Sequence, residues 1–237
     1  MNEQPVLVLG ATGTTGRRVV ARLRDAGVAV RAASRQGEVR FDWSDPGSWE
    51  PAVAGTARMY LMAPHELPVD PSFVRLAVEQ GVRHIVLLSS RGIEAMGDER
   101  LLAAERTVRE SGADWTIVRP DWFNQNFDEG FFRPAVLAGE LALPLGDLPQ
   151  AFVDADDIAA VAAAALTEDG HAGQRYELTG PRALSSPKPS RSSAGHRADR
   201  SASGDGRGLP GRADRPRRSR RADIAGDRGV CRPAGTR

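Results

Sequence analysis

A glycine-rich turn near the start of the chain constrains the fold more than any other feature. The turn reads Gly10-Ala11-Thr12-Gly13-Thr14-Thr15-Gly16 and directly follows an apolar run at residues 6–9. Apolar residues at helical spacing come after the turn, and Gly27 marks the end of the predicted helix. A strand, a glycine turn and a helix in this order form a phosphate-binding unit. Gly10 permits the tight turn, Gly13 admits a pyrophosphate, and Gly16 lets the helix pack against the strand. The sequence therefore predicts dinucleotide binding, with a plain strand-to-helix turn as the alternative.

The alternation of apolar strands and amphipathic helices continues along the chain. It predicts strands at residues 28–34, 58–63, 84–90 and 115–120 and helices at residues 71–80 and 101–111. Repeated alternation predicts an α/β fold with a doubly wound parallel sheet, the Rossmann fold, followed by a small C-terminal portion on the substrate side. Ligands of such sheets bind at the carboxyl ends of the strands. We therefore expect one crevice lined by Gly10, Ser34, Ala63, Ser89 and Pro120.

The end of the second predicted strand bears on which dinucleotide binds. An enzyme that prefers NAD usually has an acidic residue there, which accepts hydrogen bonds from the ribose hydroxyls, whereas this chain has Ser34 and Arg35. A guanidinium matches a 2′-phosphate in charge and geometry. We therefore predict NADP(H) as the cofactor; the alternative is that Arg35 is only a solvated surface residue. The predicted cofactor-binding residues are Gly10, Ala11, Thr12, Gly13, Thr14, Thr15, Gly16, Ser34, Arg35, Met62, Ala63, Pro64 and Ser89.

In their order along the chain, these motifs resemble the NmrA-like branch of the atypical short-chain dehydrogenase/reductase superfamily. The resemblance rests on the glycine turn, on Ser89-Ser90, and on the runs at residues 116–120, 152–159 and 176–181. It implies a Rossmann fold that binds NAD(P)H. It also implies one of three activities: reduction of quinones or azo compounds, reduction of the ergot-alkaloid type, or redox sensing without catalysis.

The chain departs from the main branch of that superfamily, which uses a Tyr-x-x-x-Lys pair to exchange a proton with the substrate. Its tyrosines are Tyr60 and Tyr176, and its one lysine is Lys188. We therefore exclude carbonyl reduction by the tyrosine mechanism and expect an acceptor that needs little proton donation from the protein. The catalytic residues are unknown; the candidates are Ser89 and Ser90, and a further candidate for proton transfer is His65. The alternatives are serines that satisfy backbone groups and a solvated loop histidine.

Aromatic and amide side chains gather after Pro120. This composition suits a flat, partly polar small molecule. We predict a substrate pocket that contains Pro120, Trp122, Phe123 and Asn126. Trp122 and Phe123 have the alternative of packing a helix onto the sheet, which is the interpretation that we prefer for Phe127.

Three carboxylates stand close together at Asp154, Asp156 and Asp157. They precede an apolar run that begins at Ile158, and acidic groups stabilise the positive end of a helix. We therefore predict Asp156 as the N-cap of a helix and expect no metal site.

The charge of the chain is divided between two segments. The formal net charge is +1, which combines −8 in residues 1–185 with +9 in residues 186–237. Because the second segment is rich in Arg, Gly, Ala, Ser and Pro, it has little apolar surface to bury. We predict an NADP(H)-binding Rossmann domain at residues 1–185 and a disordered, low-complexity, Arg-rich tail at residues 186–237. A shifted codon frame over residues 185–203 permits a helix and a strand, so we interpret the tail as out-of-frame sequence. The alternative is a basic arm that binds nucleic acid, but such an arm would interleave aromatic residues.

The remaining features bear on compartment and partners. The single cysteine, Cys231, rules out an intrachain disulfide. No basic segment precedes the first apolar run, and the longest apolar run, residues 158–166, is too short to span a bilayer. We expect a cytoplasmic monomer or homodimer that acts on a small-molecule substrate and binds neither a membrane nor a specific nucleic acid.

The predicted function is an NADPH-dependent reductase of a small conjugated acceptor of the quinone, azo or imine type. The alternatives are a non-catalytic NADP(H)-sensing regulator and a frameshifted product with impaired activity.

Overall fold

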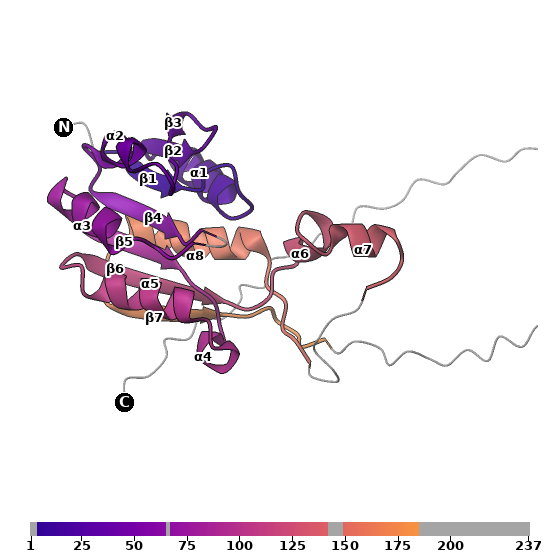
Figure 1. Cartoon of the computed structure of the whole chain (residues 1–237). Helices are drawn as coiled ribbons and strands as arrows, with labels where there is room; N and C mark the ends of the chain where they lie inside the picture. The colour runs from indigo at the N-terminus through magenta and orange to yellow at the C-terminus, as the bar shows by residue number, and fades with distance from the viewer. Residues whose placement is uncertain (1–3, 65–66, 142–148, 185–237) are drawn as a thin grey trace, which may run out of the picture. The chain divides into compact units, whose positions relative to one another are not determined.

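A parallel sheet forms the centre of the computed structural model, which describes residues 4–64, 67–141 and 149–184 (Figure 1). Its strand order is β3-β2-β1-β4-β5-β6-β7, and every neighbouring pair is parallel. The order reverses direction between β1 and β4, as in a doubly wound sheet, and this confirms the predicted Rossmann fold. The strands are β1 (Val6–Leu9), β2 (Val30–Ser34), β3 (Val39–Arg40), β4 (Arg58–Met62), β5 (His84–Leu88), β6 (Asp114–Pro120) and β7 (Gln174–Leu178).

Helices cover both faces of the sheet. Helices α1 (Gly16–Asp25) and α8 (Ala155–Thr167) share one apolar cluster with the sheet. Helices α2 (Trp49–Val53), α3 (Pro71–Glu79) and α5 (Glu99–Arg109) share the other. Figure 1 shows α3 and α5 in front of the sheet and α8 behind it. The shorter helices are η1 (Pro46–Ser48), α4 (Ile93–Met96), α6 (Gln125–Asp128) and α7 (Arg133–Leu137).

The burial of the sheet on both faces explains its continuous apolar runs. In β1, Leu7 and Leu9 belong to the cluster under α2, α3 and α5, whereas Val6 and Val8 belong to the cluster under α1 and α8. All four are at most 2% exposed. Each such side chain contributes about 1.5–3 kcal/mol of burial free energy. A strand with this pattern cannot face water on either side, so the run at residues 6–9 favours a central parallel strand.

The capping residues differ from one expectation. Helix α8 begins after Asp154, whose carboxylate accepts a hydrogen bond from the backbone N–H of Asp156 at 2.9 Å. The predicted N-cap, Asp156, is therefore wrong, because it already lies in the first turn of the helix. The physical reason is the backbone: Asp154 is extended, with φ −80° and ψ 139°, as an N-cap residue requires.

Two predictions lie outside the described residues. These are the proton-transfer candidate His65 and the Arg-rich tail at residues 186–237. Within the described part of the chain, no helix is both long and apolar enough to cross a membrane.

Candidate cofactor and substrate site

The glycine turn has the geometry that its spacing predicts. Gly10 has φ +66°, a backbone conformation that side chains disfavour. A Cβ atom on Gly16 would lie 2.1 Å from the carbonyl oxygen of Gly10, so α1 can begin against β1 only with glycine there. A Cβ atom on Gly13 would have one neighbour within 4 Å, that same oxygen at 3.2 Å. The turn is therefore closed at Gly16 and open at Gly13, where a pyrophosphate would approach.

A cavity of about 720 Å³ lies at the carboxyl ends of β1 to β4. Seven of the predicted cofactor-binding residues line it: Gly10, Thr12, Gly13, Ser34, Arg35, Met62 and Pro64. Six further residues line it that the sequence reasoning did not assign to the cofactor: Gln36, Phe41, Asp42, Trp43, Ser44 and Leu67. Four of these six residues, at positions 41–44, directly follow the short strand β3. Because ligands bind at strand ends, the end of β3 is the sequence signal that could have identified them.

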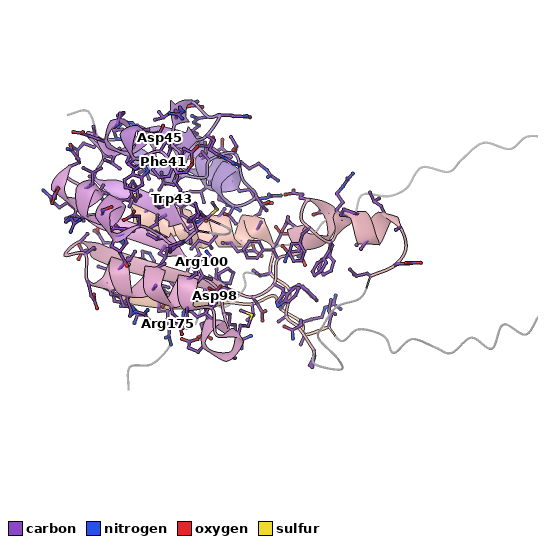
Figure 2. The ribbon with its side chains drawn as sticks, in the orientation of Figure 1. Phe41, Trp43, Asp45, Asp98, Arg100 and Arg175 are labelled. Carbon is purple, nitrogen blue, oxygen red and sulfur yellow. The ribbon has the colours of Figure 1, made fainter. Side chains whose placement is uncertain are left out.

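Aromatic packing forms one wall of this cavity. Figure 2 shows Phe41 and Trp43 close together after β3. Their ring centroids are 5.1 Å apart in an edge-on arrangement, and Trp43 contacts Phe73 of α3 at 5.0 Å in the same way. The indole of Trp49 donates a hydrogen bond to the carbonyl oxygen of Asp42 at 3.0 Å. The wall is therefore fixed by the core cluster of α2 and α3 rather than by the loop alone.

Ser34 lines the cavity, but its hydroxyl packs against the turn between β2 and β3. The residue is 7% exposed, and its Oγ is a buried side-chain atom with no hydrogen-bond partner among the described residues. A buried hydroxyl without a partner costs about 1–3 kcal/mol. The Oγ lies beside Gly37, where an added Cβ atom would be 2.5 Å from it, so the hydroxyl is closed off from the cavity. Next to it, Arg35 is exposed at the cavity edge.

An acidic group also borders the cavity. The Asp42 carboxylate accepts hydrogen bonds from the Ser44 hydroxyl at 2.7 Å and from the Ser44 backbone N–H at 3.0 Å. These bonds, and to a smaller extent the charges of Arg35 and Arg40, hold the pKa of Asp42 below its ordinary value. The cavity therefore contains a fixed anion on the β3 side and an exposed guanidinium at the end of β2.

The remaining predicted cofactor-binding residues have other surroundings. Ala11 and Gly16 are buried, and Ala63 is not part of the cavity lining. The Thr14 carbonyl accepts a hydrogen bond from Arg18 at 2.8 Å. The Thr15 hydroxyl accepts one from Tyr60 at 2.9 Å.

The expected single crevice across the strand ends is only partly formed. Gly10 and Ser34 line the cavity, whereas Ala63, Ser89 and Pro120 do not. The Ser89 hydroxyl points to α5, where it donates to Glu105 at 2.6 Å. Pro120 is buried at the end of β6. The Ser90 hydroxyl donates to the carbonyl of Arg91 at 3.3 Å, which matches the alternative of a serine that satisfies the backbone.

Neither tyrosine is placed to donate a proton to a ligand in the cavity. Tyr60 is fully buried in β4, and burial raises the pKa of its hydroxyl, although the hydrogen bond to Thr15 opposes this effect. Tyr176 lies in β7, at the opposite end of the sheet order from β1 and β2, and its hydroxyl contacts His171 Nδ1 at 2.8 Å.

The predicted substrate-pocket residues belong to an aromatic segment after β6. Trp122 stacks on Phe132 with ring centroids 5.7 Å apart and planes 5° apart. Phe123 packs against the core cluster of α1 and α8 and forms a bridge with Val153, which agrees with the packing alternative. The carbonyl of Asn126 accepts the backbone N–H of Phe132 at 3.0 Å.

The same segment contains Phe127, which contacts Phe132 at 5.5 Å and Phe152 at 5.2 Å. Phe127 therefore packs on Phe132 of its own segment and on Phe152 of the loop that precedes α8, whereas the sequence interpretation had it packing a helix onto the sheet. Phe131 in the same segment is 69% exposed.

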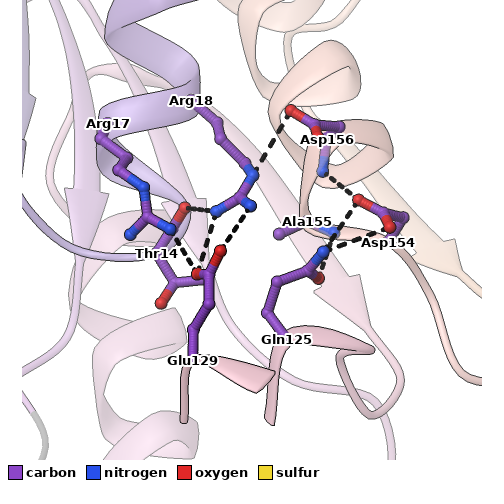
Figure 3. A network of polar contacts seen from close by, with 8 residues as sticks. All are labelled: Thr14, Arg17, Arg18, Gln125, Glu129, Asp154, Ala155 and Asp156. Atoms are coloured by element: carbon purple, nitrogen blue, oxygen red, sulfur yellow. Dashed lines mark hydrogen bonds and ion pairs between the residues drawn. The ribbon is translucent and has the colours of Figure 1, made fainter. Parts of the chain in front are cut away.

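A polar clasp joins this segment to the glycine turn (Figure 3). Arg18 of α1 donates to the Glu129 carboxylate, to Oε1 at 2.8 Å and to Oε2 at 3.3 Å, and to the Thr14 carbonyl. Its Nε lies 3.4 Å from Asp156 of α8. Arg17 also pairs with Glu129. We call the group of Arg17, Arg18, Glu129 and Asp156 the arginine clasp.

Gln125 strengthens the same junction. Its amide nitrogen donates to both Asp154 oxygens at 3.2 Å, and its amide oxygen accepts the backbone N–H of Ala155 at 2.8 Å. The start of α8, the start of α6 and the glycine turn are thereby connected through side chains. Two of the three clustered carboxylates, Asp154 and Asp156, thus serve helix capping and the clasp.

Comparison with known proteins identifies the family. A family model described as NAD(P)H-binding matches residues 10–169. The chain belongs to this NAD(P)H-binding family. Among its relatives is (4-alkanoyl-5-oxo-2,5-dihydrofuran-3-yl)methyl phosphate reductase of Streptomyces griseus, which is 37% identical over 198 residues. Another is the NAD(P)H azoreductase of Xenophilus azovorans, which is 34% identical over 202 residues. Each alignment covers 76% of this chain and 69% of the relative.

Solved structures agree on the fold of this NAD(P)H-binding protein. The NADPH-dependent quinone oxidoreductase of Escherichia coli, in complex with NADPH, matches with a TM-score of 0.60 at 23% identity, over 76% of this chain and 71% of that one. The triphenylmethane reductase of Citrobacter sp., in complex with NADP(H), matches with a TM-score of 0.58 at 23% identity, over 76% and 72%. The resemblance to NmrA-like, atypical short-chain dehydrogenase/reductase proteins is confirmed, and the chain is a member of a family of NAD(P)H-dependent reductases.

Proposed function

We propose that this protein is an NADPH-dependent reductase of a small conjugated acceptor of the quinone, azo or imine type. The observation that carries the cofactor preference is the exposed guanidinium of Arg35, which lines the cavity at the end of β2, where an acidic residue would favour NAD. A guanidinium at this position suits the oxygens of a 2′-phosphate in charge and geometry. The acidic residue that lines the cavity, Asp42, follows β3 and is already engaged by Ser44.

The residues present fit a dinucleotide along the cavity. The turn at Gly10 and Gly13, together with the N-terminus of α1, would hold the pyrophosphate. Arg35, at the end of β2, would hold the 2′-phosphate, and the aromatic wall of Phe41 and Trp43 would contact a flat ring. The chemistry that a bound reduced nicotinamide supplies is the transfer of a hydride.

Two features support an acceptor that draws its proton from solvent. Tyr60 is buried against Thr15, and Tyr176 is in β7, far from β1 and β2 in the strand order. Relatives include an azoreductase and two festuclavine synthases, whose names are consistent with conjugated or nitrogen-containing acceptors. The half-buried Trp122 and the exposed Phe131, next to the proposed cofactor site through the arginine clasp, provide flat apolar surfaces for such a molecule.

The cofactor preference is tested by titrating the purified protein with NADPH and NADH and following the reduced nicotinamide fluorescence. We expect tighter binding of NADPH. Arg35→Asp should raise the Kd for NADPH by roughly 10- to 100-fold, the range of one charge-assisted hydrogen bond, and leave the Kd for NADH nearly unchanged. Arg75→Asp, at an exposed position of α3, makes the same charge change and should leave both constants unaltered. Equal affinities that Arg35→Asp does not change would refute the NADP(H) assignment.

Turnover is tested by NADPH consumption with a panel of quinones, azo dyes and cyclic imines. We expect oxidation of NADPH with at least one of these classes. Tight NADPH binding with no turnover across the panel would favour the second candidate, a non-catalytic NADP(H)-sensing regulator. Among the described residues, neither tyrosine lines the cavity, and this observation supports the second candidate. We further propose a cytoplasmic monomer or homodimer, which size-exclusion chromatography with light scattering checks.

A further inference from the structure

A buried polar network connects the carboxyl ends of β5 and β6 to α5. The carboxylate of Glu105, on α5, accepts two hydrogen bonds from Arg119 of β6: from Nε to Oε1 at 2.7 Å and from Nη2 to Oε2 at 2.8 Å. The same Oε1 accepts the hydroxyl of Ser89 at 2.6 Å. Ser89, Glu105 and Arg119 are 5%, 3% and 4% exposed, so water competes little for these bonds. The paired geometry of the guanidinium fixes the carboxylate in one orientation.

The network determines whether the Ser89 hydroxyl can donate or accept a hydrogen bond with a further group. A hydroxyl has one hydrogen to donate and two lone pairs with which to accept. A carboxylate oxygen accepts, and the Glu105 oxygens already accept hydrogen bonds from two arginines, Arg119 and, at 3.3 Å, Arg109. The hydrogen of Ser89 is therefore committed to Glu105. Towards any further group, Ser89 offers only lone pairs.

The place of Ser89 in the sheet brings it close to the proposed cofactor site. Leu88 of β5 pairs with Met62 of β4, so Ser89 lies beside the segment that leads to Pro64. Met62 and Pro64 both line the cavity. The Pro64 carbonyl accepts a hydrogen bond at 2.8 Å from Arg100, at the start of α5. The start of α5, the end of β4 and the end of β5 thus form one connected rim.

We propose that Glu105, held by Arg119, is a positioning residue that presents Ser89 to the bound ligand as a hydrogen-bond acceptor and not as an acid. The group that Ser89 recognises is an N–H or O–H donor, such as a carboxamide or a ribose hydroxyl of the dinucleotide. Ser89 supplies no proton to the reaction. This proposal rests on the proposed function, because it requires that a reduced dinucleotide binds at the strand ends.

A purely structural role for the ion pair makes a different prediction. If Glu105 and Arg119 only stabilise the fold, Glu105→Gln lowers the midpoint of thermal unfolding and leaves ligand affinity unchanged in the fraction that is folded. If Glu105 positions Ser89, its substitution weakens NADPH binding only while Ser89 is present. A double-mutant cycle on binding separates the two roles.

The experiment uses the full chain as wild type, Ser89→Ala, Glu105→Gln and the double variant. The Kd for NADPH is measured by fluorescence titration, and the thermal midpoint is recorded for each. We expect Ser89→Ala to raise the Kd roughly five-fold, the factor for one hydrogen bond of ordinary strength. We expect Glu105→Gln to raise the Kd similarly, and the double variant to bind no more weakly than the weaker single variant. Ser111→Ala, at the end of α5, where Ser111 donates to the Val108 carbonyl, is the matched serine control and should not change the Kd.

A second readout tests the excluded acid role. With an acceptor that turns over, the pH dependence of kcat for Ser89→Ala should keep the shape of the wild-type profile. A Ser89→Ala variant that binds NADPH like the wild type overturns the proposal. The proposal is also overturned if Ser89→Ala loses one limb of the pH profile of kcat, or if the losses in NADPH affinity of the two single variants add up in the double variant. Should Glu105→Gln fail to fold, Arg119→Lys, which keeps the charge but loses the paired geometry, takes its place in the cycle. If the wild type itself does not bind NADPH, the proposed function fails at that step, before any variant is compared.

Discussion

The glycine turn and the α6–α7 segment lie next to each other but are held in place by different forces. Helix α1, which follows the turn, buries Val19, Val20 and Leu23 and begins with Gly16 in contact with the backbone of Gly10. Helix α6 buries only Gln125, and α7 buries no residue. In the α6–α7 segment, Phe131 and Leu137 are 69% and 70% exposed, and the segment is connected to α1 through the ion pairs of Glu129 with Arg17 and Arg18. Apolar burial and close backbone packing respond little to salt or pH, whereas ion pairs respond to both.

The largest expected effect comes from breaking the close backbone contact between Gly16, at the start of α1, and Gly10. In Gly16→Ala, the new Cβ would lie 2.1 Å from the Gly10 carbonyl oxygen, so strand and helix must separate. We expect a loss of more than about 3 kcal/mol of unfolding free energy, beyond the usual cost of overpacking. Chemical denaturation measures it. Gly47→Ala is the control, because its nearest contact is the Asp45 side chain at 3.3 Å and its cost should stay below about 1 kcal/mol. A Gly16→Ala protein as stable as this control would contradict the close packing.

Gly13→Ala should separate folding from binding at the same turn. The backbone oxygen of Gly10, at 3.2 Å, is the single neighbour of a Cβ atom there, so the fold should lose little stability. The methyl group would occupy the open side of the turn, where the pyrophosphate approaches. We expect a loss of NADPH affinity of roughly 10-fold or more with a thermal midpoint close to that of the wild type. Isothermal titration calorimetry measures the NADPH affinity, and thermal unfolding measures the midpoint. An unchanged affinity would show that the phosphate lies elsewhere.

On the polar side, Arg18→Ala should loosen the α6–α7 segment without unfolding the sheet. Arg18 connects Thr14, Glu129 and Asp156, and its side chain is 17% exposed. We expect a loss of about 1–2 kcal/mol of unfolding free energy, faster hydrogen exchange in residues 125–137, and a raised KM for the acceptor. Arg24→Ala, which removes an exposed pair with Glu38, is the control and should cost no more than about 1 kcal/mol. Equal exchange rates in the two variants would show that the clasp does not hold the segment.

The smallest effect is a pH dependence confined to the clasp. Hydrogen bonds from Arg18 and Arg17 lower the pKa of Glu129 from its ordinary value near 4.5 to about 2. Because the folded-state pKa is depressed, the stabilisation is complete above pH 4.5 and is lost as the pH falls towards 2. The thermal midpoint of wild type should therefore exceed that of Glu129→Gln at pH 6, and the difference should shrink between pH 4.5 and pH 3. A constant difference across this range would contradict a charged clasp. High salt at pH 6 should reduce the same difference, because the Glu129 side chain is 29% exposed.

The sequence predicts best where neighbouring residues alone carry the signal. The order of strand, glycine turn and helix identified the turn at residues 10–16, and repeated apolar runs predicted the parallel sheet. The division of the chain at residue 185 stays a prediction, because residues 185–237 lie outside those described. The caps were harder, because three carboxylates close together at Asp154, Asp156 and Asp157 differ only in backbone conformation.

The site required contacts that sequence order does not encode. Arg18 and Glu129 are 111 residues apart, and the chain has many arginines and carboxylates, so charge alone could not say which of them pair. The direction of the Ser89 hydroxyl depends on Glu105, which helix α5 places over the ends of β5 and β6. That the buried hydroxyl of Ser34 has no partner among the described residues likewise follows from its surroundings rather than from its identity. Local pattern determined the fold and the phosphate turn by itself, because each strand and helix is specified by residues close in sequence. Only the tertiary structure decided which polar groups are satisfied and which remain for a ligand, because hydrogen bonds depend on distance and direction between residues that folding brings together.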